Sequence, residues 1–251
     1  MQRVDEGLLD LDRPLPPGPV RPLPDLPEGR AVTARMLLAH TASYPNWRPG
    51  GEEAEGPLPL LHPPGARFTY SGEGIGLLQQ ALEQQAGEPL QALAQRRLFG
   101  PLGMGHSGFV WTPALGAAQA TGHDGDGRPL PPGRYRHAHA AYTLHTSVRD
   151  YAQLLAGVLQ AVEGRSPLLS PAAVRALLQP QVTLSDRAPI GRPGAARGQT
   201  VHWGLGWSLN TTAQGLIAHH SGINRTGYCG FSQFSPGRGT GLVILTNGAQ
   251  G

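Results

Sequence analysis

The spacing of apolar residues changes along this chain from a helical period to a strand period. Ile75, Leu78, Leu82 and Ala86 recur every three to four positions, which is typical of one face of a helix. After residue 200 the apolar residues form short runs separated by Gly, Asn and Pro turns. Helices followed by hairpin-linked strands favour an α+β fold, in which helices flank an antiparallel β-sheet.

Local signals predict where these elements begin and end. Thr33, Ser147 and Ser170 stand directly before apolar-periodic segments, where a hydroxyl caps a helix, and Gly87 stands where a helix ends. We therefore predict helices over 33–40, 73–86 and 89–98, and further helices beginning after Ser147 and after Ser170. Strands are predicted over 203–209, 216–220, 228–235 and 241–246.

Composition narrows the possible partners. All 20 basic residues are arginines, set against 17 acidic residues, and because the arginines are scattered we expect no nucleic-acid partner. The 36 glycines and 25 prolines predict many loops, and we expect 14–29 and 185–199 to be mobile. Cys229 is the single cysteine, which excludes an intrachain disulfide and favours a small core residue.

The ends of the chain and its hydropathy carry a second set of expectations. No apolar stretch is long enough to span a membrane, and no signal peptide precedes Met1. Residues 1–7 look like the last turns of a helix with Gly7 as its stop. Because a chain rarely opens on the end of a helix, we expect an N-terminal segment to be missing. The compartment is left open between cytoplasmic and exported.

Tyr70-Ser71-Gly72 lies where an extended run meets the start of a predicted helix, a position that holds side chains over a cleft. A phenol relays protons when a neighbouring cation lowers its pKa from about 10. Ser71 either caps the helix that starts near Glu73 or donates to a reacting group. The simpler alternative for the pair is an aromatic packing residue followed by an N-cap.

His220-Ser221-Gly222 stands at the start of a predicted strand pair. Histidine is a donor near neutral pH, and glycine lets a substrate approach the backbone closely. The next amide, that of Ile223, is a candidate donor to a developing oxyanion. The same tripeptide recurs at residues 106–108, but no strand pattern surrounds it, and we discount that copy.

The ten histidines do not predict a metal site. The close pairs His137/His139 and His219/His220 lack the i, i+4 spacing and the adjacent glutamate of a zinc-binding helix. We therefore expect neither a metal nor another cofactor. We interpret His40 as a hydrogen-bonding residue at a helix end rather than as a catalytic base.

Four segments of the sequence are each unspecific alone, but their order along the chain and the spacing between them are typical of one protein family. They are residues 36–44 (Met-Leu-Leu-Ala-His-Thr-Ala-Ser-Tyr), 63–71, 98–104 and 203–248. Together they resemble the serine β-lactamase-like family of penicillin-recognising hydrolases, which includes D-alanyl-D-alanine carboxypeptidases, class C β-lactamases and related esterases. The resemblance implies one partial domain over 1–251, with a mostly helical lobe over 30–180 carrying Tyr-Ser-Gly and strands over 200–248 carrying His-Ser-Gly.

The resemblance also implies hydrolysis of an ester or amide bond of a small-molecule substrate through an acyl-enzyme. In the family, the serine of a Ser-x-x-Lys motif attacks the carbonyl, and its lysine shares the proton transfers with a tyrosine. By position, the implied catalytic residues are Tyr70 and His220, and the implied substrate-binding residues are Ser71, Gly72, Ser221, Gly222 and Ile223.

Two departures from the family pattern affect the expected activity. Gly72 stands where the family usually has asparagine, which leans toward an esterase-like site. The chain contains no lysine, and the family places Ser-x-x-Lys just before the segment that begins at Met1. One hypothesis is a hydrolase whose nucleophile segment lies upstream, and the other is a relative that binds a ligand without hydrolysis. Under both, these 251 residues are expected to be inactive alone.

The resemblance further implies that two N-terminal strands and a closing C-terminal helix are missing. One edge of the sheet and part of its apolar surface would then be exposed to solvent. We therefore expect poor solubility or association of the chain, while its native oligomeric state is left open.

Overall fold

The computed structural model of the protein describes residues 1–16, 31–50, 57–184 and 200–251. Its helices are α1 (Gln2–Asp5), α2 (Ala34–Leu38), α3 (Gly72–Ala86), α4 (Leu90–Ala94), the π-helical turn η1 (Gln95–Phe99), α5 (Pro113–Ala117), α6 (Val148–Val162) and α7 (Pro171–Leu177). Its strands are β1 (Val182–Thr183), β2 (Val201–Trp203), β3 (Ser208–Thr212), β4 (Gly215–Asn224), β5 (Tyr228–Ser235) and β6 (Thr240–Thr246). Each strand pairs antiparallel with the next in chain order, which confirms the predicted α+β fold.

Helix caps confirm the predicted starts of three helices. The hydroxyls of Thr33, Ser147 and Ser170 each accept a hydrogen bond from the amide of the third residue of the helix that follows. Gly87 ends α3 in the left-handed conformation, with φ of 67°. Because a cap is a contact within one turn of chain, short sequence patterns were enough to predict it.

The predicted strand over 203–209 is wrong. β2 ends at Trp203, β3 begins at Ser208, and the two strands pair antiparallel across a tight turn. Gly206 occupies the turn with φ of 93°, and the amide of Gly204 donates to the carbonyl of Trp207 at 2.8 Å. These glycines make the chain reverse where the apolar pattern alone suggested one continuous strand.

Other boundaries also differ from the sequence predictions. The helix predicted over 89–98 consists of α4 and the π-helical turn η1. The short elements α5 and β1 were not predicted, because each is too short to show a period. Of the two stretches expected to be mobile, residues 17–29 and all of 185–199 lie outside the described residues.

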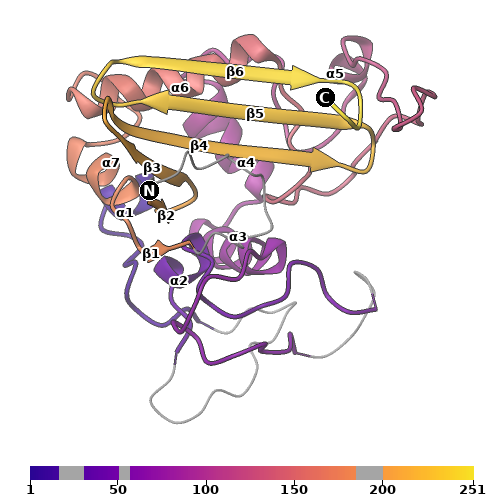
Figure 1. Ribbon diagram of the computed structural model, residues 1–251. Coiled ribbons are helices and arrows are strands. Elements are labelled where there is room, and N and C mark those ends of the chain that lie inside the picture. The colour runs from indigo at the N-terminus through magenta and orange to yellow at the C-terminus, as the bar shows by residue number, and fades with distance from the viewer. Residues whose placement is uncertain (17–30, 51–56, 185–199) are drawn as a thin grey trace.

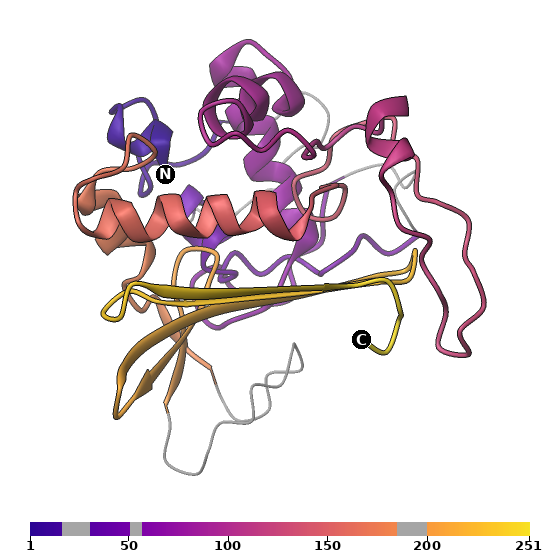
Figure 2. The same ribbon diagram turned by 90° about the horizontal axis from the view of Figure 1, so that it is seen from above.

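Helices cover one face of the sheet formed by β4, β5 and β6 (Figures 1 and 2). α6 lies along this face and builds a core with Ala218 and Phe234. Because side chains alternate along a strand, His220 lies on the same face as Ala218. No helix of the described residues covers the other face, where Ile223 and Ile244 are 80 % and 46 % exposed. β6 forms the end of the strand order.

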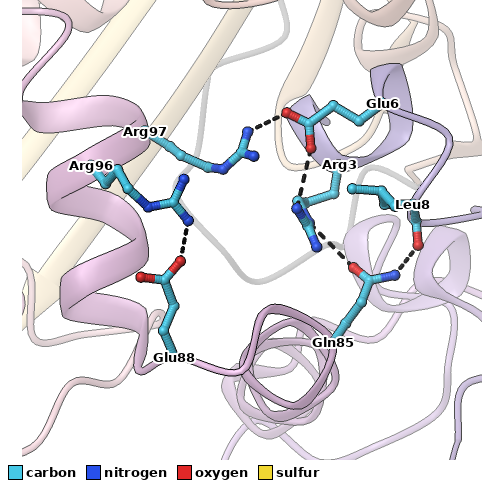
Figure 3. Close-up of polar contacts among 7 residues, drawn as sticks. All are labelled: Arg3, Glu6, Leu8, Gln85, Glu88, Arg96 and Arg97. Carbon is cyan, nitrogen blue, oxygen red and sulfur yellow. Dashed lines mark hydrogen bonds and ion pairs between the residues drawn. The ribbon is translucent and has the colours of Figure 1, made fainter.

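Polar contacts tie α1 to the helical layer (Figure 3). Glu6 forms ion pairs with Arg97 of η1 and, at 3.2 Å, with Arg3. Arg3 also donates to the side chain of Gln85 in α3 at 3.3 Å, and Gln85 donates to the carbonyl of Leu8. Exposed pairs of this kind are individually weak because water screens them. Their effect is to fix where α1 lies rather than to drive folding.

Candidate active site

His40 holds the segment around Tyr70 in place. The amide of Thr69 donates to the His40 carbonyl at 2.7 Å, and the amide of Ser71 donates to His40 Nδ1 at 3.2 Å. The imidazole also packs on the phenol ring of Tyr70, with ring centres 4.2 Å apart. His40 is therefore a hydrogen-bonding residue after the end of α2, as the sequence suggested, and it immobilises Tyr70.

Trp203 joins the end of β2 to this segment. Its buried ring lies 5.1 Å from the ring of His40, 5.9 Å from that of Tyr70 and 5.5 Å from that of His220. Its indole N–H donates to the carbonyl of Leu38 at 3.1 Å. Sequence reasoning treated Trp203 only as a strand residue. The sequence feature that could have indicated this role is the Trp-Gly-Leu-Gly-Trp run over 203–207. A tryptophan next to glycines that reverse the chain is well placed to contact both the sheet and the segments packed against it.

Tyr70 and His220 meet in a pocket of about 780 Å³ between β4, β5 and the segment that leads into α6. The Tyr70 hydroxyl lies 3.5 Å from His220 Nε2, the long limit of a hydrogen bond. Burial raises the pKa of the Tyr70 phenol. Burial, with the nearby His219, lowers the pKa of His220 to about 4. Near neutral pH the pair therefore consists of a protonated phenol and a neutral imidazole.

Among the described residues, half of β4 has no strand paired to it on the side beside this pocket, and we call this side its free edge. β3 and β4 turn through a two-residue loop, and their last pair is Ser208 opposite His219, so residues 220–224 extend beyond β3. In an antiparallel pair, hydrogen-bonded residue pairs alternate with non-hydrogen-bonded pairs, and in a two-residue hairpin the pair next to the loop is hydrogen-bonded. That pair is Thr212 and Gly215, so the backbone amides of odd-numbered residues in β4 point toward the β3 side. The amides of Ser221 and Ile223 therefore point to the free edge, and both residues line the pocket.

Ser71 and Gly72 lie at the start of α3, outside the pocket lining. The buried Ser71 hydroxyl donates to the carbonyl of Pro45 at 2.7 Å and accepts from the amide of Gly74 at 2.8 Å. Of the two roles left open for Ser71, the structure has the helix cap, and its hydroxyl is fully engaged there. Gly72 lies under the indole of Trp47, a residue that sequence reasoning missed.

Metal and membrane features can be stated for the described residues. Within them, no three His, Cys, Asp or Glu side chains gather in a way that would hold a metal ion. No helix in these ranges has the length and apolar character needed to cross a bilayer.

Known proteins resemble this chain in both sequence and fold. It is 29 % identical over 193 residues to putative beta-lactamase-like 1 of Homo sapiens, covering 75 % of this chain and 35 % of that protein. It is 28 % identical over 248 residues to lovastatin esterase of Penicillium rubens, covering 77 % of this chain and 60 % of the esterase. The chain thus spans less than two thirds of the length of either relative.

Comparison of folds gives the same result. The octameric penicillin-binding protein homologue from Pyrococcus abyssi superposes with a TM-score of 0.75 at 23 % identity, covering 99 % of this chain and 58 % of that one. In sequence, the profile of the family described as beta-lactamase matches residues 1–251. A match of this extent shows that the chain belongs to the beta-lactamase family.

Proposed function

We propose that the pocket around Tyr70 and His220 is the proton-relay and substrate-binding part of a serine hydrolase site for an ester or amide bond. One observation carries the proposal: two polar groups separated by 150 residues in sequence lie 3.5 Å apart beside the free edge of β4. In such a reaction a seryl oxygen bonds to the carbonyl carbon, and the carbonyl oxygen becomes an oxyanion. The seryl proton passes to the departing alcohol or amine, and water then releases the acyl group.

The residues of β4 suit the substrate side of this reaction. A Cβ built on Gly222 would meet no atom within 4 Å, so a substrate carbonyl can lie against the backbone there. The Ile223 amide at the free edge is our candidate donor to the oxyanion. His220, packed against Trp203, would orient the Tyr70 hydroxyl rather than act as a strong base, since its pKa is about 4.

An ester is the favoured substrate. Among the relatives is a lovastatin esterase. Gly72 supplies no side-chain amide, and its neighbouring space is filled by Trp47, so a peptide amide of the substrate finds no side-chain partner at this position. An ester lacks the amide N–H and does not need such a partner.

The nucleophile is the missing part of this proposal. The 251 residues contain no lysine and therefore no Ser-x-x-Lys, and we propose that this motif is encoded upstream of Met1 in the same reading frame. Tyr70 would then relay protons between that pair and the leaving group. The raised pKa of Tyr70 favours a second candidate, a module that binds the ligand without hydrolysing it, because a phenol without a cationic partner does not give up its proton near neutral pH.

A fluorophosphonate probe, followed by intact-mass measurement, separates the candidates. The 251-residue chain is expected to remain unlabelled, whereas a chain translated from the longer reading frame acquires one adduct on the serine of Ser-x-x-Lys. In that longer chain, Tyr70→Phe is expected to slow labelling by about 10²-fold, the usual contribution of a positioned proton-transfer group. The control is Tyr44→Phe, which removes a fully buried phenol that is not among the residues lining the pocket.

Each result decides between the two candidates. Labelling of the 251-residue chain would move the nucleophile to a serine within it and overturn the assignment. An upstream reading frame without Ser-x-x-Lys, or a stop codon directly before Met1, would favour the binding module over the hydrolase.

A further inference from the structure

Trp47 is exposed yet firmly held. Its side chain is 46 % exposed, whereas four hydrogen bonds fasten its loop to the first turn of α3. They join Gly72 N to Asn46 Oδ1 (2.9 Å), Glu73 N to Asn46 O (3.1 Å), Arg48 N to Glu73 Oε1 (3.1 Å) and the Ser71 hydroxyl to Pro45 O (2.7 Å). A rigid, exposed aromatic ring binds ligands at low entropic cost, which is why such rings are enriched at recognition surfaces.

The same bonds leave the start of α3 unable to bind an anion. Gly72 N and Glu73 N are engaged by Asn46, and Gly74 N donates to the Ser71 hydroxyl. With its first amides satisfied, this helix end has no donors to offer a carboxylate or phosphate. What it presents to solvent is the indole of Trp47.

The indole lies directly over Gly72. A Cβ built on Gly72 would lie 2.5 Å from Trp47 Cη2 and 2.7 Å from Cζ3. No side chain fits at position 72 while the indole keeps this place. Since Gly72 is two residues after Tyr70, the indole is positioned beside the segment that carries the candidate proton relay.

Two tyrosines connect Trp47 to the pocket. The ring of Tyr142 meets the indole edge-on, with centres 5.5 Å apart, and the ring of Tyr135 meets Tyr142 with centres 5.6 Å apart. Tyr135 and Tyr142 line the same pocket as Tyr70. Asn224 at the end of β4 donates to the Tyr135 hydroxyl and to the Tyr142 carbonyl, each at 3.2 Å. Tyr135 and Tyr142 are therefore hydrogen-bonded to β4, the strand that carries His220.

We propose that Trp47, Tyr142 and Tyr135 form an aromatic subsite that binds a planar aromatic group of the substrate next to the bond at Tyr70. This inference rests on the proposed function and adds to it that one substituent of the substrate is a planar aromatic group. Offset and edge-to-face contacts with three rings favour a flat aromatic group over a saturated ring of similar size.

Binding of a ketone that cannot be hydrolysed tests the subsite without requiring activity. The probe is methyl 2-naphthyl ketone, the matched ligand is decahydro-2-naphthyl methyl ketone, and affinity is measured by NMR titration of the 251-residue chain. Trp47→Ala is expected to weaken the naphthyl ketone about tenfold, the scale of lost aromatic contacts, and to leave the saturated ketone nearly unchanged. Leu61→Ala is the control, because it truncates another exposed apolar residue, 53 % exposed, and is expected to change neither affinity.

A second substitution displaces the indole without deleting it. Gly72→Ala keeps a helix-compatible backbone, because Gly72 does not have a positive φ, and its methyl group would occupy the place of the ring. It is expected to weaken the naphthyl ketone as Trp47→Ala does. In the double variant it should add nothing further, since no indole remains to be displaced.

The outcomes separate the subsite from the hydrolase. Equal binding of the two ketones by the unmodified chain, unchanged binding in Trp47→Ala, or additive effects in the double variant would each overturn the subsite. If the fluorophosphonate labels the longer chain but that chain shows no preference for the naphthyl ketone, only the subsite proposal is overturned. Preference for the naphthyl ketone without any labelling keeps the subsite and removes the hydrolase.

Discussion

The tripeptide His-Ser-Gly occurs twice in this protein, and the first copy is tied into the scaffold. The Ser107 hydroxyl donates to Asp150 Oδ2 at 2.8 Å, and the amide of His106 donates to the same oxygen at 2.7 Å. Gly108 exchanges two backbone hydrogen bonds with His145, at 3.0 and 2.8 Å. Although His106 also lines the pocket, the polar groups of this copy mainly anchor the start of α6.

The second copy lies on β4, where His220 packs among aromatic rings and Gly222 faces open space. A Cβ built on Gly222 would meet no atom within 4 Å, whereas a Cβ at Gly108 would lie 3.1 Å from Leu115 Cδ1. His220 meets Tyr70 across the pocket rather than a structural partner on its own segment. The contrast shows that the role of a short motif depends on what surrounds it in three dimensions, and three predictions follow from the different surroundings.

The largest expected effect is the loss of Asp150. Its buried carboxylate accepts two hydrogen bonds from the first copy, and Asp150→Ala would leave both donors without this acceptor. We expect the free energy of unfolding to fall by about 4 kcal/mol, the scale of two buried donors that lose their acceptor. Urea denaturation at pH 7 measures it.

The change compared with Asp150→Ala is Ser221→Ala, which removes a hydroxyl of the second copy. Ser221 lies at the free edge of β4, and its loss is expected to change stability by less than about 0.5 kcal/mol. Similar losses in Asp150→Ala and Ser221→Ala would mean that the two copies do not differ as their contacts indicate.

Acid is expected to destabilise the protein through the second copy. His220 has a pKa of about 4 in the folded chain against 6.5 for an ordinary histidine. As pH falls from 6.5 toward 4, the unfolded chain binds a proton that the folded chain does not, so stability decreases. Between pH 7 and 4.5 this one group accounts for about 2 kcal/mol. His40, with a pKa of about 3, acts in the same direction.

Unfolding measured across that pH range in two variants sharpens the comparison. His220→Gln is expected to remove the roughly 2 kcal/mol of acid dependence that this group contributes. The remainder is due to His40, His145 and His219, whose pKa values burial also lowers. His106→Gln replaces an exposed ring of the first copy and serves as the control. An unchanged acid dependence in His220→Gln would show that this ring is not held neutral by its surroundings.

The smallest expected change in stability comes from substituting the glycines of the two copies, Gly108 and Gly222. Gly108→Ala forces its methyl group against Leu115 and is expected to cost about 1–2 kcal/mol through overpacking. Gly222→Ala places its methyl group in open space and is expected to change stability by less than about 0.5 kcal/mol. Thermal unfolding of the two variants side by side measures the difference, and a larger loss in Gly222→Ala would contradict the open geometry of the second copy.

Much of the fold could be read from the sequence because the interactions responsible are local. The caps at Thr33, Ser147 and Ser170 act within one helical turn, and the strands β5 and β6 lie within one residue of their predicted bounds. The reversal at Gly204 and Gly206 was missed, since apolar residues continue on both sides of it. Tyr70 and His220 were chosen as candidates from the types and positions of the residues around them.

What only the tertiary structure decided is which residues meet. The contact of Tyr70 with His220, the bridging position of Trp203 and the cover of Gly72 by Trp47 all join segments far apart in the chain. Such contacts depend on how helices and sheet pack together, and local patterns carry no record of that packing. The sequence by itself determined the family and the order of elements, and it predicted two candidate site residues. The packing then gave each His-Ser-Gly copy its partners, which are Asp150 for the first copy and Tyr70 for the second, because these contacts join segments that are distant in the chain.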